Sequence, residues 1–210
     1  MNWLDKLEYK YRRYAIPNLM KIVVIGQLIV WAVVMLLDQR LYGLLTLTRA
    51  GLAHFQIWRL VTFIFVPPLT RPLSLAIELY LYYVIGNTLE RQWGTFRFNV
   101  YYLLGMVGAV VACLLTGYSG NSAINMSLFF AFAALYPDMQ FLLFFLIPIK
   151  AKWLGIAGGV RYLLEFLGGN LITKVTLAFG LLNFILFFGP TLKRDYDNYR
   201  RRKQWQDQWR

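Results

Sequence analysis

Residues 98–117 read FNVYYLLGMVGAVVACLLTG, a run without a single charged side chain. A helix needs roughly 20 predominantly apolar residues to cross the hydrocarbon core of a bilayer, so this stretch predicts a membrane-spanning helix. The whole chain has a matching composition: 59% of its 210 residues are hydrophobic and 15% are charged, with a mean hydropathy of +0.49. Soluble domains have about 25% charged residues. The excess of apolar residues indicates that lipid is the main solvent.

Further apolar segments flank this run and predict an all-α, polytopic membrane protein with six transmembrane helices. The predicted spans cover residues 22–37, 73–89, 98–117, 122–136, 153–167 and 172–192. Together, residues 1–192 are expected to form one membrane domain, and residues 193–210 a basic cytoplasmic tail. Two other apolar segments are too short to cross as helices and contain or end in proline. Of these, residues 57–67 predict an interfacial or partly inserted element, and residues 139–149 a segment that does not span.

The distribution of positive charge predicts the orientation of the chain. The net charge is +12, and Lys and Arg are enriched in the cytoplasmic loops of membrane proteins. With both termini in the cytoplasm, sixteen Lys and Arg lie on the cytoplasmic side and five on the opposite side. We therefore expect a multi-pass protein of the cell membrane with cytoplasmic N- and C-termini. The tail, with Arg200–Lys203, Trp205 and Trp209, is expected to bind anionic lipids.

Several classes of protein are excluded or not expected. The single cysteine, Cys113, excludes a disulfide framework and a Cys-based zinc site, and the single histidine, His54, excludes any site that needs two. The basic residues lie beside apolar runs and are rarely interleaved with aromatic residues in an exposed block, so no nucleic-acid partner is expected. No metal cluster or phosphate-binding glycine loop is present, and no cofactor or metal is expected.

Glu78 is the most informative single residue, because it lies within the second predicted span. An ionisable group in hydrocarbon costs about 2.5 kcal/mol or more, so it should face the bundle interior or a water-filled cavity. Glu78 is then either a polar seat for a substrate helix or proton, or a structural group that ties helices together. Asn183, in the last span, is a candidate partner. Arg161 and Glu165, four residues apart, predict an ion pair on one helix face.

Four phrases, in order along the chain, resemble segments of the rhomboid superfamily over about residues 20–190. Residues 55–62, FQIWRLVT, resemble its GQ-x-WR-x-x-T segment, and residues 86–94, GNTLERQWG, its G-x-x-LE-x-x-x-G segment. Residues 131–137, AFAALYP, resemble the end of its fourth helix. Residues 144–153, FFLIPIKAKW, resemble the FFLIP-x-x-xKW stretch of bacterial members. The resemblance implies a rhomboid-like bundle of six helices.

The resemblance also implies where catalytic groups would lie. Active rhomboids resemble serine hydrolases. Their nucleophile is a serine on the fourth helix, and it needs a histidine on the sixth helix as its base. Counting back from Pro137 places Ser122 at the nucleophile position, where the alternative interpretation is a helix N-cap. Counting back from Gly86 places Ser74 and Glu78 where second-helix His and Asn residues would hold the oxyanion.

The histidine position decides the prediction on catalysis. One alignment puts Phe166 in place of the histidine, and the other puts Thr176 or Leu177 there, so neither supplies a base. His54 lies in the first loop and does not match the catalytic position. A carboxylate of Glu78 at the oxyanion site would repel the developing negative charge. The chain therefore resembles a rhomboid-like pseudoprotease, the class that includes the derlins, and is not expected to be an enzyme.

The resulting hypothesis is that the protein binds transmembrane helices of client membrane proteins. A polar interior would receive the client helix, and a loop with Trp58 and Arg59 would lie at the membrane interface and perturb the bilayer. Two alternatives stay open: an active intramembrane serine protease that uses Ser122 with an unusual base, and a small transporter or lipid scramblase. The residues assigned to the polar interior are Glu78, Ser74, Ser122, Asn125 and Asn183.

Overall fold

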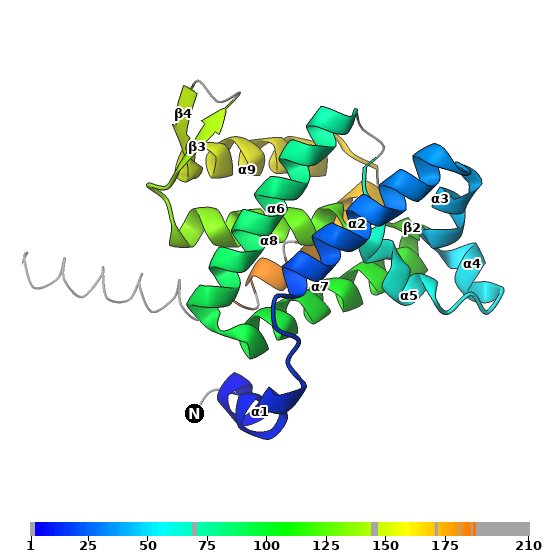
Figure 1. The fold of residues 1–210 in the computed structure, drawn as a ribbon, viewed down its shortest axis with the longest axis horizontal. Helices are drawn as coiled ribbons and strands as arrows, with labels where there is room; N and C mark the ends of the chain where they lie inside the picture. Colours follow the sequence, from blue (N-terminus) through cyan, green and yellow to red (C-terminus); the bar gives the residue numbers. More distant parts are fainter. Residues whose placement is uncertain are drawn as a thin grey trace, which may run out of the picture.

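The computed structural model describes residues 3–68, 71–143, 147–170, 172–180, 182–185 and 187, and most of them are helical (Figure 1). The long helices are α2 (Leu19–Leu36), α6 (Pro72–Trp93), α7 (Thr95–Thr116), α8 (Ser122–Leu135) and α9 (Ala151–Gly168). A further helix follows over residues 172–180 and 182–185. The short elements are α1 (Trp3–Tyr11), η1 (Arg12–Tyr14), α3 (Arg40–Leu45), α4 (Arg49–Ala53), α5 (Arg59–Thr62) and η2 (Phe63–Phe65).

Five of the predicted spans lie on α2, α6, α7, α8 and α9, and the described part of the sixth lies on the helix after α9; the boundaries differ by a few residues. Within the described residues, two helices, α2 and α7, are long and apolar enough by themselves to cross a membrane. Helix α8 and the helix after α9 are apolar but shorter. The prediction of six crossings is therefore not confirmed by helix length and hydropathy alone. Residues 188–192, and the tail 193–210, lie outside the described part of the chain.

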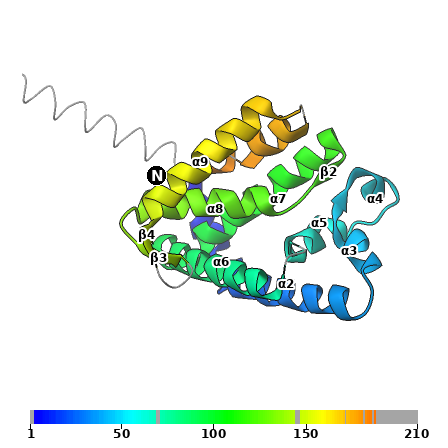
Figure 2. The ribbon, with the colours of Figure 1, turned by 90° about the horizontal axis from the view of Figure 1, so that it is seen from above.

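The core of the bundle forms around one face of α7. Its buried residues recur at helical spacing, as in Phe98, Tyr101, Tyr102, Gly105 and Ala109, and they face the interior of the bundle. Helix α8 packs against α6, α7 and α9, and it lies between them in Figure 2. Gly105 faces side chains of α8 and of the last helix. Because glycine has no side chain, these helices can approach α7 closely.

The outward faces of the long helices are apolar. Large hydrophobic side chains are exposed on α2, α7 and α9. Soluble monomers rarely expose contiguous apolar patches of this kind, whereas a lipid environment favours them. The exposed residues include Leu28, Ile29 and Leu36 on α2, Leu103, Val107 and Leu115 on α7, and Ile156, Leu163 and Leu164 on α9.

The connection between α2 and α6 folds back onto the end of α7. It contains α3, α4, α5 and η2, together with strand β1 (Leu47–Thr48), which pairs antiparallel with β2 (Tyr118–Ser119). Residues 57–67, predicted as a non-spanning element, form α5 and η2 and end in an extended segment. The β1–β2 pairing brings this connection next to the start of α8.

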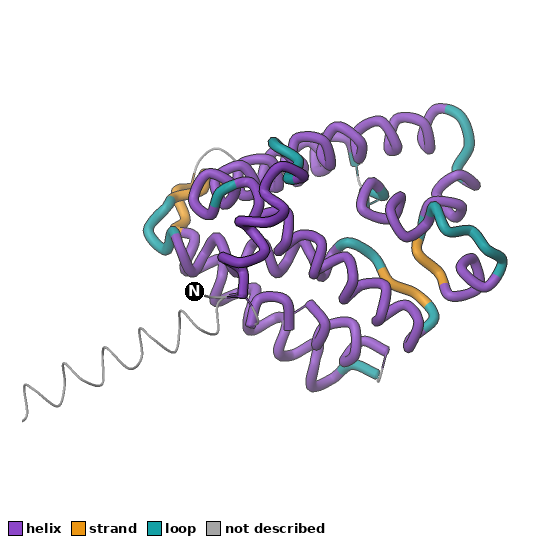
Figure 3. Tube along the Cα trace, turned by 90° about the horizontal axis from the view of Figure 1, so that it is seen from below, coloured by secondary structure: helices purple, strands orange, loops and turns teal. Residues whose placement is uncertain are grey.

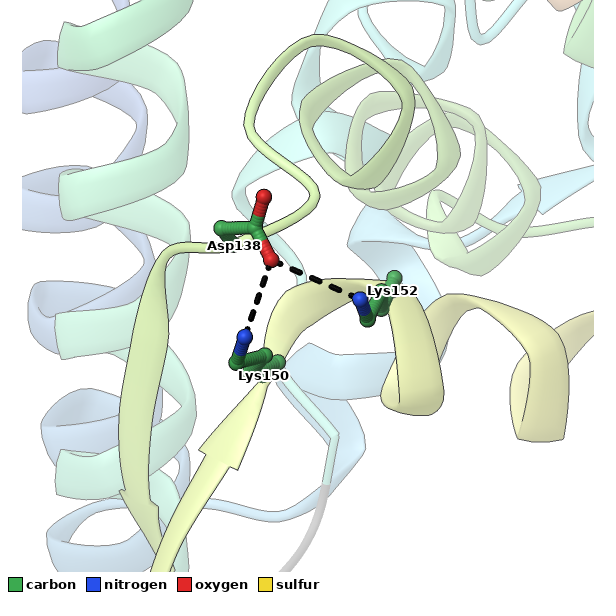
Figure 4. Close-up of polar contacts among 3 residues, drawn as sticks. All are labelled: Asp138, Lys150 and Lys152. Atoms are coloured by element: carbon green, nitrogen blue, oxygen red, sulfur yellow. Dashed lines mark hydrogen bonds and ion pairs between the residues drawn. The ribbon is translucent and has the colours of Figure 1, made fainter.

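A β-hairpin follows α8 at the opposite end of the bundle from β1 and β2 (Figures 1 and 3). Strand β3 (Gln140–Leu143) pairs with β4 (Ile147–Lys150), so the described part of the segment predicted not to span, residues 139–149, consists mainly of two short strands. Asp138 accepts hydrogen bonds from Lys150 Nζ at 3.1 Å and from Lys152 Nζ at 3.4 Å (Figure 4). These ion pairs close the base of the hairpin between α8 and α9.

The N-terminal arm binds to the turn between α6 and α7. Glu8 Oε2 forms an ion pair with Arg97 Nε at 2.9 Å, and Glu90 Oε1 accepts a hydrogen bond from the Asn18 backbone N–H at 2.9 Å. The Asn99 side chain accepts a hydrogen bond from the backbone N–H of Ile16 and donates one to the Ile16 carbonyl. These contacts hold the arm at one end of the bundle, on the side away from β1 and β2 (Figure 1).

Candidate functional site

A cavity of about 180 Å³ lies where the α2–α6 connection meets α6 and the start of α8. Its walls come from four parts of the chain that are distant in sequence. The β1–β2 pairing and the extended segment after η2 bring these parts together. The lining residues that carry polar or aromatic side chains are Tyr42, Thr46, Phe63, Glu78, Tyr82, Tyr118, Ser119, Asn121 and Ser122.

Glu78 lines this cavity from α6, as its position in the second span predicted. Leu75 and Leu79 are buried in the core, while Glu78 is half-buried. Tyr82, one turn further along the same face, donates a hydrogen bond from its hydroxyl to Glu78 Oε1. Among the described residues, no Lys or Arg forms an ion pair with Glu78.

Ser122 is the first residue of α8 and lines the same cavity with an exposed side chain. The structure therefore brings Glu78 and Ser122 together, although no hydrogen bond joins them within the described residues. The N-cap interpretation of Ser122 was wrong by one residue, because Asn121 occupies the N-cap position. The Asn121 side chain does not cap the helix and reaches across to the connection instead.

Two side-chain amides hold the irregular backbone beside the cavity. Asn121 Nδ2 donates to the carbonyls of Ile64, at 3.2 Å, and Val66, at 2.9 Å. Gln27 Nε2, from the buried face of α2, donates to the Ile64 carbonyl at 2.8 Å. Non-helical backbone in a membrane protein must find such internal partners. Sequence reasoning missed both amides, although a glutamine within the first apolar span was a signal for a buried contact.

Arg59, which was predicted to anchor the first loop, lies inside the connection and not at its surface. Its side chain is 6% exposed. The guanidinium donates to the carbonyls of Gly43, at 2.7 Å, and Thr46, and to Gln56 Oε1 at 2.6 Å. Trp58 is 50% exposed, as an interfacial residue would be, and its Nε1 donates to the Leu44 carbonyl at 3.3 Å.

The remaining predicted polar residues do not share this cavity. Ser74 is exposed in the first turn of α6 and does not line the cavity, so its assignment to the polar interior was wrong. Asn125 is buried on α8, and its Oδ1 has no hydrogen-bond partner in the described part of the chain. Asn183 is buried on the last helix and donates to the Tyr101 carbonyl at 3.2 Å, so it is not the partner of Glu78.

A second cavity, of about 10 Å³, lies deeper between α7, α8 and the last helix. It is large enough for about one water molecule. Asn183 and Ser127 line it, and so does Ser119, which also lines the larger cavity. The Asn183 Oδ1 and Ser119 Oγ atoms lack partners within the described residues. The interior is therefore polar around both cavities.

The structure separates the two candidate positions for a catalytic histidine. Phe166 lies on α9 and is 37% exposed. Leu177 is buried on the last helix, where its carbonyl accepts a hydrogen bond from the Tyr162 hydroxyl at 3.1 Å. Thr176, next to it, lines the small cavity. The positions that the last-helix alignment assigns to the histidine therefore face the interior of the bundle. None of the three residues can act as a base.

The only histidine in the chain lies away from the cavity walls. His54 is exposed at the end of α4, and its Nδ1 lies 3.0 Å from the Ala50 carbonyl. Among the described residues that line the 180 Å³ cavity, none carries an imidazole, amine or guanidinium group. The described residues also contain no group of three or more His, Cys, Asp or Glu side chains that could hold a metal ion.

Two tyrosines, Tyr42 from the connection and Tyr118 from the α7–α8 turn, line the cavity. Partial burial raises the pKa of the Tyr42 hydroxyl, and the nearby Tyr118 raises it further. Tyr42 therefore stays protonated at neutral pH and remains a hydrogen-bond donor. Glu78 is the one carboxyl side chain among the described residues that line the cavity.

Comparison with known families shows which family this chain resembles. The model of a family described as eukaryotic integral membrane proteins matches residues 19–186, from the start of α2 into the last helix. The match covers the cavity and all the helices around it. The family is described as eukaryotic, so it does not support the resemblance to bacterial members at residues 144–153, of which 144–146 lie outside the described residues. No curated protein matches the chain.

Proposed function

Since the chain belongs to a family of eukaryotic integral membrane proteins, we propose that it is a rhomboid-like member that binds transmembrane segments of other membrane proteins without cleaving them. The observation that carries the proposal is the cavity lined by both Glu78 and Ser122, whose described lining residues include no Lys, Arg or His. A serine hydroxyl at its ordinary pKa is a poor nucleophile without a base within reach. Such a site can hold a client, and its described lining offers no imidazole or amine to activate the serine.

The topology that we propose has six crossings, with both termini in the cytoplasm. Two sets of contacts support it, because each joins segments that this topology puts on the same side. The β1–β2 pairing joins the first loop to the α7–α8 turn, both on the outer side. The Glu8–Arg97 ion pair and the Asn18–Glu90 hydrogen bond join the N-terminal arm to the α6–α7 turn, both on the cytoplasmic side.

The α2–α6 connection would make lateral entry of a client easier. Its elements are short, and Phe55, Ile57 and Trp58 expose their apolar side chains. Short apolar elements at the interface favour local thinning of the bilayer. Thinning would lower the energetic penalty of moving a weakly hydrophobic helix from lipid to a position against the bundle, next to the cavity that contains Glu78.

Site-specific photocrosslinking in native membranes tests this proposal. A photoreactive amino acid at position 78 should capture membrane proteins through their transmembrane segments. The matched control places the same residue at position 163, which is exposed on α9 and should give only diffuse crosslinks to lipid and to passing proteins. Equal capture patterns at positions 78 and 163 would contradict the proposal.

A protease that uses Ser122 is the second candidate, because Ser122 and Glu78 line the same cavity. It predicts covalent labelling by a fluorophosphonate probe in liposomes, with the label lost in Ser122→Ala. The client-binding proposal predicts no labelling of either protein. Exposure of Ser122 to the cavity means that the probe can reach the hydroxyl, so a negative result would count against catalysis.

A further inference from the structure

The walls of the 180 Å³ cavity combine a carboxylate with aromatic rings. Tyr42, Phe63, Tyr82 and Tyr118 line it together with Glu78. The faces of aromatic rings attract cations, and the attraction strengthens when the cation is removed from water. A carboxylate among several rings is therefore a setting in which an ammonium or guanidinium group binds well.

The Glu78 carboxylate has no internal countercharge among the described residues. One of its oxygens accepts the Tyr82 hydrogen bond, and no Lys or Arg forms an ion pair with it. The buried guanidinium of Arg59 is not among the lining residues, and it is held by the carbonyls of Gly43 and Thr46 and by Gln56. The cavity thus contains a carboxylate that no cationic side chain among the described residues pairs with.

The volume of the cavity limits what it can take. Pockets for drug-sized ligands have volumes of about 300–1,000 Å³, whereas this one has about 180 Å³. The space suits a single long side chain and not a whole helix. A client helix would therefore lie outside, against the apolar faces of the bundle, and extend one residue inward.

We propose that the cavity binds the cationic side chain of a Lys or Arg within the membrane segment of a client. This inference rests on the proposed client-binding function and names the class of client. A charged residue at the centre of a bilayer is costly unless it finds a polar partner. Glu78 and its aromatic neighbours supply that partner, so helices with an intramembrane Lys or Arg gain more from binding than uncharged helices.

Peptide binding to the full-length protein tests the inference. The protein is reconstituted in phosphatidylglycerol bilayers, whose headgroups contain no ammonium group, with a Leu- and Ala-rich transmembrane peptide that carries a photoreactive leucine. The central residue of the peptide is either Lys or Leu. The Lys peptide should bind about tenfold more tightly than the Leu peptide, a difference of about 1.4 kcal/mol.

Two variants identify the source of the preference. Glu78→Gln keeps the size and the hydrogen bond from Tyr82 but removes the charge, and it should lower binding of the Lys peptide to the level of the Leu peptide. Glu165→Gln, which removes a carboxylate paired with Arg161 on the exposed face of α9, should keep the preference. Elution volume and helical content of each variant confirm that it is folded.

The outcomes separate this inference from the function on which it rests. Equal binding of both peptides to the wild-type protein would overturn the cation inference and leave client binding standing. Failure of both peptides to bind would overturn client binding itself. A Lys preference that disappears in phosphatidylethanolamine bilayers would assign the cavity to the ammonium group of a lipid headgroup and overturn the assignment to a client side chain.

Discussion

Substitution of Asn121 by alanine should destabilise the fold beside the cavity. Asn121 Nδ2 is the donor to the Val66 carbonyl and one of two donors to the Ile64 carbonyl. A buried carbonyl left without a partner costs about 1–3 kcal/mol. Ile64 keeps its bond from Gln27, so most of the loss falls on Val66, and we expect a total of about 2 kcal/mol. The melting temperature should fall by about 4–8 °C.

The chain carries its own reporter for this measurement. Cys113 is the only cysteine and is 0% exposed, so a fluorogenic maleimide reacts with it only when the bundle opens. Ser122→Ala is the matched control, because it removes an exposed neighbouring hydroxyl and should change stability by less than about 0.5 kcal/mol. Equal melting temperatures for Asn121→Ala and Ser122→Ala would refute the assigned role of the amide.

A double-mutant cycle sharpens the same prediction. Gln27→Leu alone should have a small effect, because Asn121 still bonds the Ile64 carbonyl and the unpaired Gln27 Oε1 is removed. With both substitutions the Ile64 carbonyl loses both donors. The combined loss should exceed the sum of the single losses by about 0.5 kcal/mol or more. Simple additivity would show that the two amides do not share this acceptor.

Two further predictions concern the hairpin and the helix packing. Lys150 lowers the pKa of Asp138, so the ion pair stabilises the fold at pH values above the ordinary carboxyl pKa of 3.8, and this stabilisation is lost as the pH falls through the lowered value. The difference in melting temperature between wild type and Asp138→Asn should therefore be present at pH 7 and vanish in strong acid. A difference that does not depend on pH would contradict this. Gly86→Ala would bring a methyl group into contact with the Met20 side chain and should destabilise the protein by about 1–3 kcal/mol. Gly159 has open space around it, so Gly159→Ala should be neutral or stabilising. Similar effects of the two substitutions on the melting temperature would refute the packing argument.

The helices could be predicted from the sequence because hydropathy and length are local properties. Residues 98–117 and 22–37 match α7 and α2 within a few residues, and proline at 137 marks the end of α8. The hairpin after α8 was harder to predict. Its proline excluded a spanning helix, but strand pairing depends on the partner segment and not on the segment alone.

The candidate site could be predicted only in part, since it is built from contacts between distant segments. Glu78 and Ser122 were found because a carboxylate in an apolar run and a serine at a family position are visible in the sequence. The roles of Asn121 and Gln27 depend on carbonyls that are 37 to 57 residues away. The inward direction of Arg59 likewise depends on how the connection folds around it.

The most direct test of the central claim follows the fate of a captured client. Full-length protein with a photoreactive residue at position 78 is co-reconstituted with a bound client, and the mass of the client is followed over hours, with and without Ser122→Ala. The account predicts that the client is captured at full length and stays intact in both proteins. A client fragment that appears with Ser122 present and is absent in Ser122→Ala would contradict it.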